Sequence, residues 1–348
     1  MVLNPIFYKK WSKALIDKDF TFKETIKNLN LTALQICFIV DKKKRLIGSI
    51  TDGDIRRAIL KGCSLKDKIT KYINYKPKKI YNKFPVANQI NLLRKYKLSN
   101  IPIINKKGHI IDLIMWTDLD YDNNLNAPIV FLVGGKGKRL APLTNTTPKP
   151  MIKLKGVPIL EKLVVKAKTE GFKNIYFITN YLENKIIKYF GDGKKLGVNI
   201  IYIKEKRPLG TAGGLGLINF NCKKIIVSNG DILTNINFKN LLAYHSSSNN
   251  DLTVGVKNIK LSNPYGVFKL KKKGQINTFI EKPTENHFIS AGVYVLNTNL
   301  LNLIQKNKYM DMSRLITLVM NKKYKINACP IHENWVDIGT HENLNKFL

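Results

Sequence analysis

Apolar and polar residues alternate in two different patterns along this chain, and the change falls near residue 126. In the first part, short apolar runs occur in pairs: 36–40 with 46–50, and 101–104 with 109–114. A charged or polar turn separates the members of each pair, and a T-x-x-D tetrapeptide follows each pair. The pattern predicts two copies of a strand–turn–strand unit, spaced by about 65 residues, as in a paired structural module.

The first T-x-x-D tetrapeptide has the signature of a helix start. Thr51 or Asp52 can cap the helix, because a side-chain oxygen there accepts from an unpaired backbone N–H of the first turn. Ile55, Ile59 and Leu60 then supply an apolar face. We therefore expect a helix that runs through Leu60.

The short, Asn-rich segment 121–127 reads as a boundary between domains. After it, apolar runs of strand length alternate with segments of helical periodicity. The predicted strands are 129–133, 174–179, 198–203 and 225–228, and the predicted helices are 158–170 and 183–190. This alternation is typical of a mostly parallel, doubly wound sheet with helices on both faces.

Composition narrows the function classes. The formal charge is +35, but the lysines are spread over the whole chain, so we expect a solvated surface and no nucleic-acid partner. No apolar run reaches the ~20 residues of a membrane span, and the N-terminus lacks the apolar core of a signal peptide. We expect a cytoplasmic protein without a membrane partner. The four cysteines show no metal-binding spacing.

The residues after the run 129–133 combine glycines with cations. Gly134, Gly135 and Gly137 permit close approach of backbone N–H groups to phosphate oxygens. Arg139 adds a bidentate fork, and Lys149, between two prolines, adds a point charge. Because ligands of open α/β sheets bind beyond the carboxyl ends of strands, this stretch predicts a phosphate site. It matches neither the Walker A loop nor the dinucleotide fingerprint.

The stretch G-G-x-G-x-R-L-x-P-L-T, followed by P-K-P-M, resembles the signature of the sugar-phosphate nucleotidyltransferases. The resemblance implies a glycosyltransferase-A-like, Rossmann-like α/β domain over 128–348 with a mixed, mostly parallel sheet. It also implies that the loop 208–214 recognises the base. The nucleotide-binding residues it implies are Leu132, Gly134, Gly135, Gly137, Lys138, Arg139, Lys149, Gly210, Thr211 and Gly214, of which Arg139 and Lys149 are also catalytic.

Later motifs follow in the family's order. Asp231 in N-G-D and Asp337 in W-V-D-I-G-T resemble the two carboxylates that hold Mg²⁺, or Mn²⁺, and Asp231 is also expected to be catalytic. The segments N-P-Y-G, E-K-P and S-A-G-V-Y resemble the sugar-phosphate site. The residues implied there are Gly266, Glu281, Lys282, Ser290 and Gly292, with Ser290 standing where the family usually has Asn.

The first part of the chain, 1–125, resembles a tandem CBS pair with copies at about 8–65 and 66–125. CBS pairs usually bind adenosine-type ligands, which implies an adenine nucleotide near Thr51, Asp54, Thr117 and Asp120. A purely structural or dimerising pair without ligand is an equally open interpretation. CBS pairs often associate, so a homodimer is expected.

Together these features predict an enzyme that joins a nucleoside triphosphate to a sugar-1-phosphate and releases pyrophosphate. The CBS fusion resembles guanylyltransferases of bacterial surface-sugar pathways, including legionaminic acid synthesis, which favours GTP with glucosamine-1-phosphate, mannose-1-phosphate or a similar sugar. Thymidylyl, uridylyl or cytidylyl transfer to a hexose or heptose phosphate is the alternative. A catalytically inactive nucleotide sensor is a second alternative, although all the charged motif residues are retained.

Overall fold

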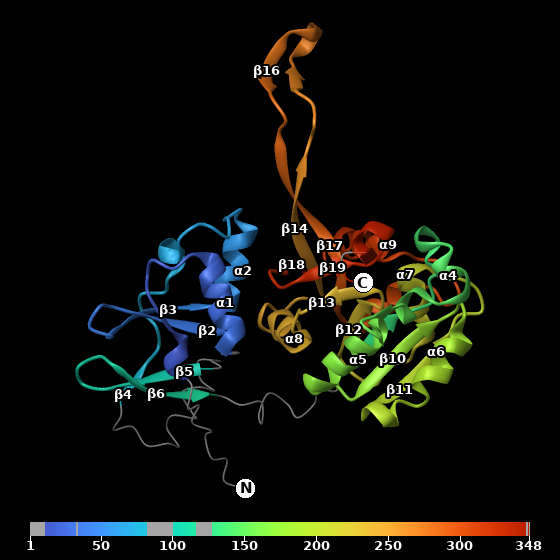
Figure 1. Ribbon diagram of the computed structural model, residues 1–348, viewed down its shortest axis with the longest axis horizontal. Coiled ribbons are helices and arrows are strands. Elements are labelled where there is room, and N and C mark those ends of the chain that lie inside the picture. The colour runs from blue at the N-terminus through green and yellow to red at the C-terminus, as the bar shows by residue number, and fades with distance from the viewer. Residues whose placement is uncertain (1–10, 33, 82–99, 116–126, 346, 348) are drawn as a thin grey trace. The chain divides into compact units, whose positions relative to one another are not determined.

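The computed structural model describes residues 11–32, 34–81, 100–115, 127–345 and 347. The chain divides into two compact units, residues 1–124 and residues 125–348, and each is described by itself (Figure 1).

The described part of unit 1 contains two three-stranded sheets of the same topology. In each, the outer strand is parallel to the middle one, which is antiparallel to the third. The predicted strand–turn–strand pairs and the helix through Leu60 are confirmed. The elements are β1 (Leu15–Ile16), α1 (Phe22–Thr32), β2 (Ile36–Val40), β3 (Leu46–Thr51), α2 (Asp52–Leu60), β4 (Ile80–Tyr81), β5 (Asn100–Ile104) and β6 (Ile110–Met115).

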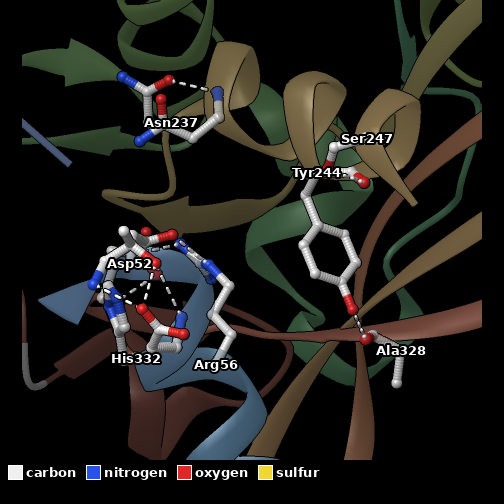
Figure 2. A network of polar contacts seen from close by, with 11 residues as sticks. Asp52, Arg56, Asn237, Tyr244, Ser247, Ala328 and His332 are labelled. Atoms are coloured by element: carbon white, nitrogen blue, oxygen red, sulfur yellow. Dashed lines mark hydrogen bonds and ion pairs between the residues drawn. The ribbon is translucent and has the colours of Figure 1, made fainter. Parts of the chain in front are cut away.

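Helix α2 begins with a complete capping box. The Thr51 hydroxyl accepts from the Asp54 N–H at 3.2 Å, and the Asp54 carboxylate accepts from the Thr51 N–H at 2.9 Å. Asp52 also forms an ion pair with Arg56 one turn later, at 2.6 Å (Figure 2). The pattern T-x-x-D therefore has a local structural role in this copy.

Unit 2 is built on a seven-stranded sheet, which is mostly parallel. Its strands lie in the order β11 (Asn199–Lys204), β10 (Asn174–Thr179), β7 (Ile129–Leu132), β12 (Lys224–Asn229), β17 (Thr284–Asn297), β14 (Leu252–Ser262) and β18 (Ile326–Pro330). The two contacts of β17 are antiparallel and all others are parallel. The predicted strands at β7, β10, β11 and β12 are confirmed.

Side chains of β7 alternate between two cores. Ile129 and Phe131 are buried in one core, and Val130 is buried in the other. Because both faces are covered, the strand needs no polar positions, which explains its continuous apolar run. The helices that contribute to these two cores are α5 (Ile159–Thr169), α6 (Glu183–Phe190), α7 (Gly210–Gly213), α8 (Phe238–Ser247) and α9 (Met312–Asn321), while α4 (Leu143–Thr146) and α10 (His341–Asn345) lie outside them.

Helix α8 is held against the sheet by polar as well as apolar contacts. Asn237 caps its first turn, and the Tyr244 hydroxyl donates to the Ala328 carbonyl in β18 at 3.0 Å (Figure 2). Phe238 at its start is fully buried in the core. These contacts fix the half of the sheet that carries β14 and β17.

Three two-stranded ladders complete unit 2: β8 (Lys153–Leu154) with β9 (Val157–Pro158), β13 (Ile232–Thr234) with β19 (Trp335–Asp337), and β15 (Val267–Leu270) with β16 (Ile276–Ile280). The β15–β16 ladder is the end of a long hairpin that continues β14 and β17 away from the sheet (Figure 1). Among the described residues, no helix is both long and apolar enough to cross a membrane.

Candidate active site

The glycine-rich loop that follows β7 lines a cavity of about 460 Å³ at the carboxyl edge of the sheet. Gly137 has φ +62°, and a Cβ there would lie 3.0 Å from the Cβ of Lys149. Only glycine combines that backbone conformation with such a close approach. All the nucleotide-binding residues predicted from the motifs, except Gly214, line this cavity, as does Asp231.

Two carboxylates predicted to act together meet in this structure. Strands β13 and β19 pair antiparallel with Ile232 opposite Asp337, so Asp231 and Asp337 are neighbours despite their separation in sequence. The Lys149 ammonium lies between them, with Nζ 2.5 Å from Asp231 Oδ2 and 3.4 Å from Asp337 Oδ1. Lys149 is only 7% exposed, so these acids supply the partners that a buried cation requires.

The donor set fits the expected divalent cation. Asp231 and Asp337 contribute hard oxygen ligands that converge on one point, marked by the Lys149 ammonium. Mg²⁺ typically binds through one or two carboxylates and completes its shell with water and substrate phosphates. Within the described residues, no group of three or more His, Cys, Asp or Glu side chains forms a full cage. The pair therefore suits a divalent cation that takes its remaining ligands from water or from a bound phosphate group.

A buried acid that the sequence reasoning missed also lines the cavity. Glu205 follows β11 directly and is 6% exposed. Its Oε1 has no hydrogen-bond partner among the described residues, and burial raises the pKa of its carboxyl to about 7, against a smaller lowering by the Leu209 N–H. Added Cβ atoms at Gly214 and Gly134 would lie 2.7 Å from Oε1 and 3.3 Å from Oε2. The two glycine segments thus leave room for this carboxylate.

The second glycine segment is anchored to α9. Gly210 has φ +80°, and a Cβ there would lie 2.6 Å from the Met310 carbonyl oxygen. The Thr211 hydroxyl accepts from the Met312 N–H at 2.7 Å, so this side chain holds the start of α9. In the sequence, Glu205 is marked only by its position as an acidic residue between an apolar strand and this glycine segment. Its burial, which points to a functional role, is visible only in the structure.

The predicted sugar-phosphate residues are not gathered at the cavity. Gly266, Glu281 and Lys282 lie on the projecting hairpin, and the side chains of the latter two are exposed. At its base, Gly292 has φ +69°, and a Cβ there would lie 2.4 Å from Nδ2 of Asn229, which lines the cavity. Ser290 shares a hydrogen bond of 2.8 Å with the Tyr294 hydroxyl. The role of all five in sugar binding stays a prediction.

The residues of unit 1 that were predicted to bind a CBS ligand are likewise not seen to form a binding site among the described residues. Thr51 and Asp54 are engaged with each other in the capping box of α2, and Asp54 also pairs with Arg57 at 2.5 Å. Thr117 and Asp120 lie outside the described residues. Adenine nucleotide binding by these four therefore stays a prediction.

Comparison with known proteins agrees with this geometry. A family model described as nucleotidyl transferase matches residues 128–347, and a CBS domain model matches residues 15–61. The mannose-1-phosphate guanylyltransferase of Mycobacterium tuberculosis is 32% identical over 62% of this chain and 61% of its own length. The catalytic subunit beta of the Drosophila melanogaster enzyme is 32% identical over 60% of this chain and 58% of its own.

The chain thus spans about three fifths of the length of these relatives. Among solved structures, HddC from Yersinia pseudotuberculosis has a TM-score of 0.50 and 24% identity, over 64% of this chain and 97% of that one. A Bacillus anthracis protein solved with sucrose has a TM-score of 0.52 and 20% identity, over 63% and 93%. These two show the fold. With the family model covering more than half of its residues, the chain belongs to the nucleotidyl transferase family.

Proposed function

We propose that this protein transfers the guanylyl group of GTP to a sugar-1-phosphate and releases pyrophosphate. The proposal rests on one cavity in which the glycine loop, the Lys149–Asp231–Asp337 cluster and the buried Glu205 converge. The names of the relatives, mannose-1-phosphate guanylyltransferases, support the same base and suggest mannose-1-phosphate or a related hexosamine phosphate as acceptor.

Chemically, a phosphate oxygen of the sugar-1-phosphate forms a bond to the α-phosphorus of GTP. The bond from that phosphorus to the bridging oxygen breaks, and pyrophosphate leaves with the electron pair. The attacking phosphate is already ionised near neutral pH, so no general base is needed. Catalysis then depends on positioning two anions and on stabilising charge at the α-phosphate.

The residues of the cavity divide this work. Backbone N–H groups around Gly134 and Gly135, with the guanidinium of Arg139, hold the triphosphate, because they present hydrogen-bond donors to its oxygens. Lys149, held by Asp231 and Asp337, is kept where negative charge develops. A magnesium ion on the two aspartates supplies further charge neutralisation when it is bound.

Glu205 is the basis for choosing guanine. An ionised carboxylate accepts two hydrogen bonds, and the N1–H and N2–H₂ groups of guanine are two adjacent donors. Uracil and thymine offer one ring N–H flanked by carbonyl oxygens, and adenine and cytosine present an acceptor nitrogen at the same edge. This buried carboxylate, whose Oε1 has no partner among the described residues, therefore favours guanine, since another base would place an acceptor atom against one of its oxygens.

The finer assignments that accompany this proposal are Mg²⁺ as the cation, a cytoplasmic location and a homodimer. An adenine nucleotide at the CBS pair is also part of the proposal. Retention of Arg139, Lys149 and Asp231 in one cavity, with Asp337 in contact with Lys149, favours an enzyme over a nucleotide sensor.

The direct test is pyrophosphate release with Mg²⁺ and a matrix of GTP, UTP, dTTP and CTP against several sugar-1-phosphates. We expect turnover with GTP and a hexose or hexosamine phosphate. Turnover with UTP or dTTP but not GTP would refute the base assignment. If no pair of substrates released pyrophosphate, the hypothesis of an enzyme would be refuted and that of a nucleotide sensor favoured.

GTP binding is expected to depend on pH through Glu205. Burial raises the pKa of the Glu205 carboxyl to about 7, and guanine requires the ionised form of this group. Below that pKa most molecules carry a protonated Glu205 and must lose the proton to bind. The KM for GTP should therefore fall about tenfold as the pH rises from about 6 to about 8, following the ionised fraction.

The matched control is Glu205→Gln, which cannot ionise. Its KM for GTP should retain only the pH dependence that arises from the triphosphate itself. An identical pH profile in both proteins would show that Glu205 does not titrate on binding.

A further inference from the structure

The projecting hairpin holds Gly266, Glu281 and Lys282, whose role in sugar binding is predicted, but its end carries a surface that the nucleotidyl-transfer proposal does not use. We define the arm as residues 258–288, where β14 and β17 pair only with each other among the described residues. No arm residue is buried, and nearly all are exposed. A two-stranded ribbon with no covered face is marginally stable in water, so such an arm calls for a partner.

One face of the arm's end is apolar. Phe268 lies opposite Phe279, with ring centroids 4.7 Å apart, and Leu270 lies opposite Ile276. Cross-strand partners share a face, and Leu270 follows Phe268 by two residues, so the four side chains form one patch. They are 54%, 52%, 63% and 58% exposed in that order. We call them the apolar tip face.

The turn that closes the arm is strongly basic. Lys271, Lys272 and Lys273 are consecutive and exposed, and the turn closes with Lys273 at φ +67° and Gly274 at φ +81°. Over the whole arm, six lysines less two glutamates leave a formal charge of +4. The apolar tip face therefore adjoins a positive turn.

An apolar face beside a positive turn restricts the kinds of partner that the arm can bind. A second arm would bring +4 against +4, within a chain whose formal charge is already +35. A nucleic acid would satisfy the lysines but offers little to the aliphatic Leu270 and Ile276, which cannot stack on bases as aromatic rings do. An anionic bilayer meets both needs, because its phosphates attract lysine and its interface accepts aromatic and aliphatic side chains.

We propose that the arm docks on an anionic lipid membrane, with the apolar tip face at the lipid interface and Lys271–Lys273 on the lipid phosphates. This differs from the expectation of no membrane partner, which considered only spanning segments. Interfacial docking needs no spanning helix. It is also independent of the nucleotide chemistry proposed above.

The test is co-sedimentation of the full chain with phosphatidylcholine vesicles that contain or lack phosphatidylglycerol. Binding is expected only with phosphatidylglycerol. The triple variant Lys271→Glu, Lys272→Glu, Lys273→Glu should bind about 10²-fold more weakly, since each lysine near such a surface contributes about a fivefold factor.

The chain offers a matched control. Lys42, Lys43 and Lys44 form a second exposed lysine triplet, in unit 1, and its last residue has φ +58°, close to that of Lys273. Changing all three to Glu should leave vesicle binding within a few fold of wild type. An equal loss in both triple variants would mean that the general lysine surface binds, and would overturn the proposal.

Insertion of the apolar tip face is read separately. The chain has three native tryptophans, so the emission of a Phe268→Trp variant is read as the difference from wild type, and that difference should move to shorter wavelength on phosphatidylglycerol vesicles. Binding without that shift would show adsorption by charge alone and overturn the assigned orientation. If the protein bound soluble polyglutamate but not the vesicles, its partner would be an acidic protein, and the membrane proposal would be overturned.

Discussion

Replacing Asp231 with asparagine should lower kcat by about 10²–10³-fold. The change keeps the size of the side chain but removes the charge that holds Lys149 at 2.5 Å and supplies one of the two expected metal ligands. Losing one preorganised charge-stabilising contact in an active site has an effect of this size. The measurement is steady-state pyrophosphate release at saturating substrates, with thermal melting to verify that the variant is folded.

The companion and control variants sharpen this test. The variant Arg139→Ala should have a kcat lower by about 10²-fold or more, because it also loses a charge-stabilising contact. Asp192→Asn is the control, because Asp192 also pairs with a lysine, Lys194 at 2.9 Å, but both side chains are largely exposed. It should turn over like the wild type. Near-normal kcat in folded Asp231→Asn would remove the two-aspartate cluster from the mechanism.

Replacing Glu205 with glutamine should change the base preference of the enzyme. The amide offers one acceptor and one donor, so one of the two guanine N–H donors meets an N–H group. We expect kcat/KM for GTP to fall by about 10–10²-fold, the range for losing a hydrogen bond to a charged group. The kcat/KM for UTP and dTTP should rise relative to that for GTP, because the edge of uracil or thymine presents an N–H donor next to a carbonyl acceptor, which complements the amide.

The matched control here is Glu161→Gln in α5, whose carboxylate accepts from the Tyr189 hydroxyl and does not line the cavity. Its base preference should equal that of the wild type. If Glu205→Gln lowered activity equally with all four triphosphates, Glu205 would be a structural residue and the argument for guanine would fail.

The elements that the sequence predicted are those set by local patterns. The strands at β7, β10 and β12 and the helices α5 and α6 agree with expectation, because periodicity reports which faces are buried. The half of the sheet made by β14, β17 and β18 was not predicted. Its long antiparallel strands carry polar and lysine-rich segments on the arm, where no core imposes an alternation.

From the sequence alone we predicted the nucleotide half of the site, since Gly134–Lys149 is one continuous segment whose residue types are typical of phosphate binding. The rest of the site depends on contacts between distant segments of the fold. The fold brought Asp231 and Asp337 to Lys149 through the register of β13 against β19. It also buried Glu205 between two glycine segments and set Glu281 and Lys282 on the arm. The physical reason is range: conformational preference acts over a few residues, whereas strand register and burial depend on contacts between distant segments.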